Sequence, residues 1–110
     1  MTHTVTTRGK LQILTLSGEI DMHSSPAVRK VILALVKTNS PVAVDLSAVK
    51  YMDSSGVATL VEGLQNARKL GQDFILAAPT GSVLGVIRLA RLDKVFRIVP
   101  SLAECDGLGN

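Results

Sequence analysis

The chain has 110 residues, of which 46% are hydrophobic and 3% aromatic, so it is long enough for one packed core and too short for two. Twelve Lys and Arg against nine Asp and Glu give a net charge of +3, but the cations are spread along the chain, and we expect no nucleic-acid partner. The single cysteine, the polar N-terminal segment and the absence of an apolar run near the roughly 20 residues that cross a bilayer predict a cytoplasmic protein without disulfides or membrane contact.

The N-terminal part of the sequence predicts a β-hairpin. Residues Thr4–Arg8 and Leu11–Leu16 are rich in Thr, Val, Ile and Leu, and Gly9-Lys10 between them has the composition of a turn. Gly18 is expected to end the second strand. Both faces of that strand carry apolar residues, so we expect both faces of the sheet to be at least partly covered.

A helix and a buried strand follow the hairpin. The segment Ser24-Ser25-Pro26 has the form of a helix start, in which Ser25 is the expected cap and proline takes the first helical position. Apolar residues then recur every three or four positions and predict a helix over 26–37. The β-branched segment Val42–Leu46 predicts an interior strand.

The second half alternates helices and strands. A helix begins near Ser54 and ends at Gly71, which is suited to the left-handed conformation that closes a helix. Beyond it we expect a strand over Phe74–Ala78, a helix over Ser82–Leu92, a strand over Val95–Val99 and a short helical tail. Crossovers of helical length predict an α/β fold: a mainly parallel mixed sheet with an N-terminal antiparallel hairpin, and helices packed on the sheet.

The junction between the strand at Val42–Leu46 and the next helix is the place where we expect chemistry. Ligands and partners tend to meet open α/β sheets at the carboxyl ends of the strands. The first N–H groups of a helix are unpaired there, so an anion on Ser54 or Ser55 would be held favourably. The simplest alternative is that Asp53 or Ser54 only caps the helix.

Enzymatic and metal sites are less favoured by the sequence. A catalytic serine would lack the G-x-S-x-G pattern and would have only His3 or His23 as its base. The residues Glu19, Asp21, His23 and Asp53 are too scattered in kind and spacing to predict a metal centre. Cys105 stands between two acidic residues, which disfavours a thiolate nucleophile. We therefore expect no catalytic residue, metal or cofactor.

Three segments carry a resemblance to a known family. They are Gly18-Glu19-Ile20-Asp21, where the family has Gly-Glu-Leu-Asp, then Asp45-Leu46-Ser47 at a strand end, and Met52-Asp53-Ser54-Ser55-Gly56. In this order they resemble the STAS domain of bacterial anti-sigma-factor antagonists. The resemblance implies a single STAS domain over residues 1–110, with its core at about 5–99.

The resemblance also implies a switching mechanism and its residues. The first serine of the pair, Ser54, corresponds to the family's phosphoacceptor, flanked by Asp21 and Asp53. The unphosphorylated antagonist binds an anti-sigma factor that is a GHKL-type serine kinase, and the sigma factor is released. Phosphorylation ends that binding, and a PP2C-type phosphatase restores it. The residues expected to bind the partner are Glu19, Asp21, Asp53, Ser54, Ser55 and Gly56.

Physical chemistry limits how a phosphate at Ser54 could act. A charge of about −1.5 to −2 at a helix N-terminus is tolerated by that helix, so we expect the fold to survive and the loss of binding to be local. Two alternatives stay open. The same helix end could dock a STAS regulatory subunit on the ATPase of a transporter or another signalling complex without phosphorylation, or Ser54 and His23 could serve a small hydrolase.

Overall fold

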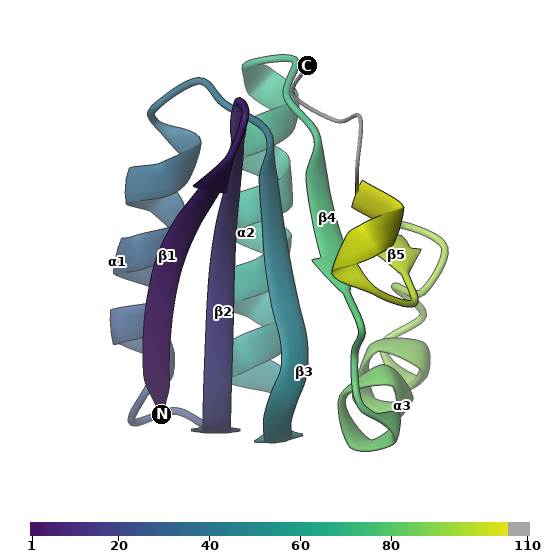
Figure 1. Cartoon of the computed structure of the whole chain (residues 1–110). Coiled ribbons are helices and arrows are strands. Elements are labelled where there is room, and N and C mark those ends of the chain that lie inside the picture. The colour runs from purple at the N-terminus through teal and green to yellow at the C-terminus, as the bar shows by residue number, and fades with distance from the viewer. Residues whose placement is uncertain (106–110) are drawn as a thin grey trace.

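The computed structural model describes residues 1–105 and contains a five-stranded sheet with helices packed on it (Figure 1). The elements are β1 (Thr2–Arg8), β2 (Leu11–Ile20), α1 (Ser25–Val36), β3 (Val42–Met52), α2 (Ser54–Lys69), β4 (Phe74–Ala77), α3 (Gly81–Leu89), β5 (Arg97–Val99) and a 3-10 helix, η1 (Leu102–Cys105). The strands lie side by side in chain order, β1 antiparallel to β2 and the others parallel. The predicted mixed sheet is confirmed. Residues 106–110, which the expected domain included, lie outside the described residues.

The second strand is longer than its sequence indicated. The expected end at Gly18 is wrong, because β2 continues to Ile20 and β3 continues beside it to Met52. Gly18 has a φ of +87°, and the register between the two strands shifts between Gly18 and Glu19. A glycine at such a bulge bends a strand without ending it. The longer strands carry Glu19 and Ile20 to the start of α2.

The helix starts and ends differ from the sequence predictions in detail. The residue that precedes α1 is Ser24, and no side-chain cap is formed there, whereas Ser25 is the first helical residue and is buried. The Ser24 hydroxyl donates instead to the Glu19 carbonyl at 3.1 Å. The prediction that Ser25 caps the helix is therefore wrong. Helix α3 and strand β5 are both shorter than expected, and Arg91, with a φ of 60°, follows the end of α3.

The core lies on both faces of the sheet. Helices α1 and α2 cover one face (Figure 1), where Leu14 and Leu16 of β2 pack with the apolar residues of both helices. The alternate residues of β2, Leu11 and Ile13, belong to a smaller cluster on the other face, together with Cys105 of η1. This alternation is the two-residue period of a strand covered on both sides, as the sequence predicted.

Helix α2 is held close to its neighbours by a glycine. A Cβ at Gly63 would lie 2.6 Å from Ile32 Cγ2 of α1 and 2.8 Å from Phe74 Cζ of β4. The two helices and the sheet can therefore approach one another only because this position has no side chain. This packing fixes the direction of α2 and hence the place of its N-terminus.

Candidate functional site

The carboxyl ends of β2 and β3 form one edge of the sheet. Ile20 and Met52 stand opposite each other in the parallel register. The backbone N–H of Asp53 donates to the carbonyl of Ile20 at 3.1 Å, which ties the start of α2 to the end of β2. The turn after β2 and the first turn of α2 consequently lie together, as the sequence predicted.

Asp53 is the N-cap of α2 and organises its first turn. The Asp53 Oδ1 atom accepts hydrogen bonds from the Ser55 N–H at 2.9 Å, the Gly56 N–H at 3.4 Å and the Ser55 hydroxyl at 2.5 Å. These bonds, the Ser55 hydroxyl first, lower the pKa of the Asp53 carboxyl below its ordinary value. The carboxylate is therefore charged at neutral pH and begins the helix.

Asp21 organises the neighbouring turn in the same way. Its Oδ1 atom accepts from the backbone N–H groups of His23 at 2.9 Å and Ser24 at 3.1 Å, and these two bonds lower the pKa of Asp21. The Ser24 hydroxyl in turn accepts from the Asp21 N–H at 3.0 Å. The turn is thus held by its own side chains.

The two serines of the motif have different surroundings. Ser55 is partly buried and its hydroxyl donates to Asp53. Ser54 is exposed, and within residues 1–105 no hydrogen bond engages its side chain. Ser54 therefore offers an available hydroxyl at the helix N-terminus, and Ser55 does not.

Gly56 supports this edge from beneath. It is buried, and a Cβ there would lie 2.6 Å from Met52 Cγ and 3.0 Å from Ile20 Cγ2. Its missing side chain lets α2 start directly against the ends of β2 and β3. Of the six residues expected to contact a partner, Gly56 is thus placed to position the others, while Glu19 and Ser54 are exposed and Asp21, Asp53 and Ser55 are partly so.

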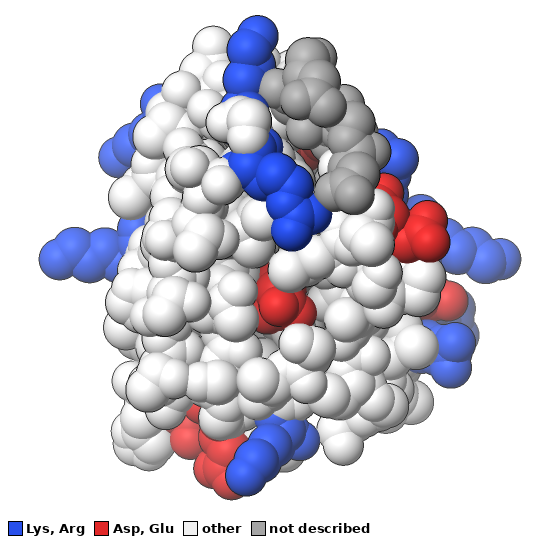
Figure 2. Space-filling model, in the orientation of Figure 1, with Lys and Arg blue, Asp and Glu red and all other residues white. Residues whose placement is uncertain are grey.

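Two exposed apolar residues at this edge were not identified from the sequence. Met22, in the turn after β2, is 68% exposed, and Tyr51, near the end of β3, is 48% exposed. Acidic and basic side chains lie next to each other at the same edge of the sheet (Figure 2). Alternation could not have indicated Tyr51, because Lys50 and Tyr51 are both exposed at the irregular end of β3, and an exposed residue in a turn has no sequence signal either.

The hydrolase alternative would pair the Ser54 hydroxyl with the His23 imidazole. Within the described residues no hydrogen bond links Ser54 to His23. In the same part of the chain no group of three or more His, Cys, Asp and Glu is placed to hold a metal ion. Nor is any helix of residues 1–105 long and apolar enough to cross a membrane. The edge presents a surface of polar and apolar side chains around the Ser54 hydroxyl.

A mixed sheet with this edge defines a small α/β domain that presents a serine at a helix start. Residues 3–105 match the family model of the STAS domain, and the chain belongs to that family. It is 31% identical over 107 residues to the anti-sigma-F factor antagonist RsfB of Mycobacterium tuberculosis, covering 94% of this chain and 85% of RsfB.

Solved structures share the fold. An anti-sigma factor antagonist from Mycobacterium paratuberculosis is 32% identical and superposes with a TM-score of 0.87, covering 94% of this chain and 88% of that one. SpoIIAA of Bacillus is 18% identical. Its unphosphorylated form superposes with a TM-score of 0.80, covering 96% of this chain and 94% of that one, and its phosphorylated form with a TM-score of 0.74, covering 94% and 96%. At 18% identity, the similarity to SpoIIAA shows that the two proteins share a fold and nothing more.

Proposed function

We propose that the chain is an anti-sigma-factor antagonist that binds a GHKL-type anti-sigma kinase through the edge around Ser54 and is switched off by phosphate on Ser54. A PP2C-type phosphatase resets the switch. The observation that carries the proposal is the Ser54 hydroxyl, which is exposed at the start of α2 and engaged by no hydrogen bond within residues 1–105. The name of the Mycobacterium tuberculosis relative supports the regulatory role.

The hydrogen bonds in the first turn of α2 favour Ser54 over Ser55 as the residue that the kinase phosphorylates. Transfer of a phosphoryl group to Ser55 would first require its hydroxyl to leave Asp53, whose carboxylate also holds the N–H groups that begin the helix. Ser54 reacts without that cost, because among residues 1–105 no hydrogen bond engages its side chain. The kinase therefore acts on Ser54 and leaves the cap intact.

The phosphate changes the surface and leaves the fold in place. The helix dipole favours a negative group at the start of α2, where Asp53 already accepts the N–H groups of Ser55 and Gly56. The edge already carries Glu19, Asp21 and Asp53, so a phosphate of about −2 charges concentrates negative charge there. A partner that buries this edge must then remove water from a doubly charged group, which costs several kcal/mol. Binding is therefore lost through a change at this surface, without a change in the fold.

The apolar residues of the edge supply the centre of the interface. Met22 and Tyr51 are large and exposed; Met22 follows Asp21 in the chain, and Tyr51 is paired with Glu19 across the two strands. Interfaces between proteins typically place such residues at their centre and charged residues at their rim. We assign Met22 and Tyr51 to the contact with the kinase, in addition to the residues around Ser54.

The direct test is incubation with candidate GHKL kinases and ATP, followed by mass mapping of the phosphate. We expect one phosphate on Ser54, none on Ser54→Ala, and full labelling of the matched control Ser55→Ala. The phosphorylated protein should lose kinase binding while its circular dichroism is unchanged. Kinase binding without any phosphate transfer would reject the switch and leave a docking role for the same edge. Loss of helix content on phosphorylation would reject the local mechanism.

A further inference from the structure

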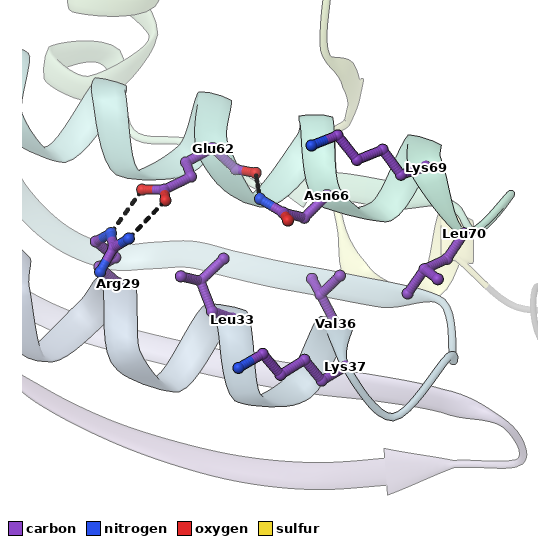
Figure 3. Close-up of a pocket in the computed structure, with 8 residues that line it drawn as sticks. All are labelled: Arg29, Leu33, Val36, Lys37, Glu62, Asn66, Lys69 and Leu70. Carbon is purple, nitrogen blue, oxygen red and sulfur yellow. Dashed lines mark hydrogen bonds and ion pairs between the residues drawn. The ribbon is translucent and has the colours of Figure 1, made fainter.

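A groove runs between α1 and α2, away from the Ser54 edge (Figure 3). Its volume is about 410 Å³. Leu33 and Val36 of α1 point toward α2, and Leu70, at the end of α2, points back toward α1, so the floor is apolar (Figure 3). Lys37 and Lys69 lie along the two walls. The groove thus combines an apolar floor with cationic walls.

An ion pair lies at one side of the groove. It neutralises Glu62, the one acidic residue among the described residues that line the groove. Arg29 Nε lies 2.6 Å from Glu62 Oε2, and Arg29 Nη2 donates to Glu62 Oε1 at 2.7 Å. The bidentate contact lowers the pKa of Glu62 and raises that of Arg29. Within the described residues Lys37 and Lys69 have no carboxylate partner. Their charges are available to a ligand.

The charge of the chain is concentrated on these two helices. Counted with the residues that follow them, α1 and α2 hold five cations and one acid: Arg29, Lys30, Lys37, Arg68, Lys69 and Glu62. Their net charge is therefore +4, against +3 for the whole chain, and all other residues together carry −1. Of these cations, Arg29, Lys37 and Lys69 line the groove, and Arg29 is paired with Glu62.

The shape of the groove selects among anionic occupants. Leu70 is 46% exposed, so the groove is open to solvent, whereas small-molecule sites bury most of their ligand. Leu33 and Val36 are recessed between two helices, whereas a lipid surface is met by protruding apolar side chains. An open groove with an apolar floor is the form that receives one face of an amphipathic helix.

We propose that the groove between α1 and α2 binds an acidic amphipathic helix of a partner protein. Its apolar side chains contact Leu33 and Leu70, and its carboxylates lie against Lys37 and Lys69. The groove residues of α2 include Glu62, eight residues after Ser54, and Lys69, 15 residues after it, so the groove begins about 12 Å along the helix axis from Ser54 and extends to about 22 Å or more. Its lining residues differ from those of the Ser54 edge, and the groove is a second docking site, separate from the switch proposed for Ser54.

The test uses a fluorescein-labelled helical peptide of about 15 residues with leucines at i, i+3, i+4 and i+7 and flanking glutamates, measured by fluorescence anisotropy. Lys37→Glu/Lys69→Glu should weaken binding at least about tenfold, as expected when attractive charges become repulsive. Leu70→Gln, at an exposed position, should weaken it about threefold by reducing the apolar contact. Lys10→Glu, on the β1–β2 turn, is the charge control and should leave affinity within about twofold.

Several outcomes would overturn this inference. The first is that the glutamate peptide does not bind. The second is that a matched lysine peptide binds with equal affinity, or that Lys10→Glu reduces affinity as much as the double variant, since either result would show unspecific attraction. A second assay measures whether the protein sediments with phosphatidylglycerol vesicles. If it does, if Lys37→Glu/Lys69→Glu abolishes the sedimentation, and if no peptide is bound, the groove contacts a membrane surface and the inference is wrong. Ser54→Glu should leave peptide binding unchanged, and its loss there would disprove two independent sites. A failed phosphorylation test would not affect these measurements.

Discussion

The start and the interior of helix α2 are held in place by different kinds of contact. At the N-terminal end, Asp53 holds Ser55 and the backbone by hydrogen bonds, and Ser54 beside them is engaged in none within residues 1–105. Further along, Gly63 brings Ile32 and Phe74 within packing distance of the helix backbone, and there the position of the helix depends on how closely these side chains pack against it. The difference teaches that the residue proposed to carry the signal is the one that the fold does not need.

The largest effect is expected from charge at Ser54. Ser54→Glu places a carboxylate where the phosphate is proposed, and we expect binding to the anti-sigma kinase to fall about 100-fold or more, since a buried unpaired charge costs several kcal/mol. The midpoint of thermal unfolding should stay within about 2 °C, because a negative charge suits a helix start. Isothermal titration calorimetry and circular dichroism measure the two quantities. A variant that still binds, or that unfolds, contradicts the comparison.

The next effect is expected at Gly63 and should appear in stability. Gly63→Ala forces a methyl group against Ile32 and Phe74, and we expect the free energy of unfolding in urea to fall by about 1–3 kcal/mol. Kinase binding by the folded protein should be unchanged. Gly85→Ala is the matched control, since a Cβ there meets no atom within 4 Å and alanine favours a helix by up to about 1 kcal/mol. Equal effects of the two substitutions would refute the packing role of Gly63.

The smallest effect is expected at the N-cap and should depend on pH. Bonds formed only in the folded chain lower the pKa of Asp53 below its ordinary value of 3.8. Its ionised form therefore stabilises the fold above that pH, and this contribution is lost as the pH falls through the lower pKa of the folded state. The difference in unfolding free energy between the wild type and Asp53→Asn should be present at pH 7 and shrink below pH 4. Asp73→Asn controls for the loss of an exposed carboxylate. A difference that does not vary with pH would contradict this account.

The architecture could be predicted from the sequence because its signals are local. Thr- and Val-rich segments around Gly9-Lys10 indicated the hairpin, and helical spacing between short apolar segments indicated parallel strands. The errors concern positions whose conformation depends on contacts with residues distant in the sequence. Gly18 is compatible with a strand end, and only its pairing beside β3 makes it a bulge within a longer strand.

The candidate site was predictable in place and only partly in detail. The motif from Asp53 to Gly56 located the helix start, but the hydroxyl that Asp53 engages depends on the direction of its carboxylate. The burial of Gly56 follows from Ile20 and Met52, which come from two strands. The groove between α1 and α2 had no sequence signal, since it arises where two helices of different segments meet.

The hydrogen bond from the Asp53 N–H to the Ile20 carbonyl has a consequence for recognition. It joins segments that are distant in the chain, so the surface around Ser54 is assembled only after β2 and β3 have paired. A nascent or partly unfolded chain displays the serine without its surroundings. A partner that requires the assembled edge responds to the amount of native protein, and incomplete molecules do not compete for it.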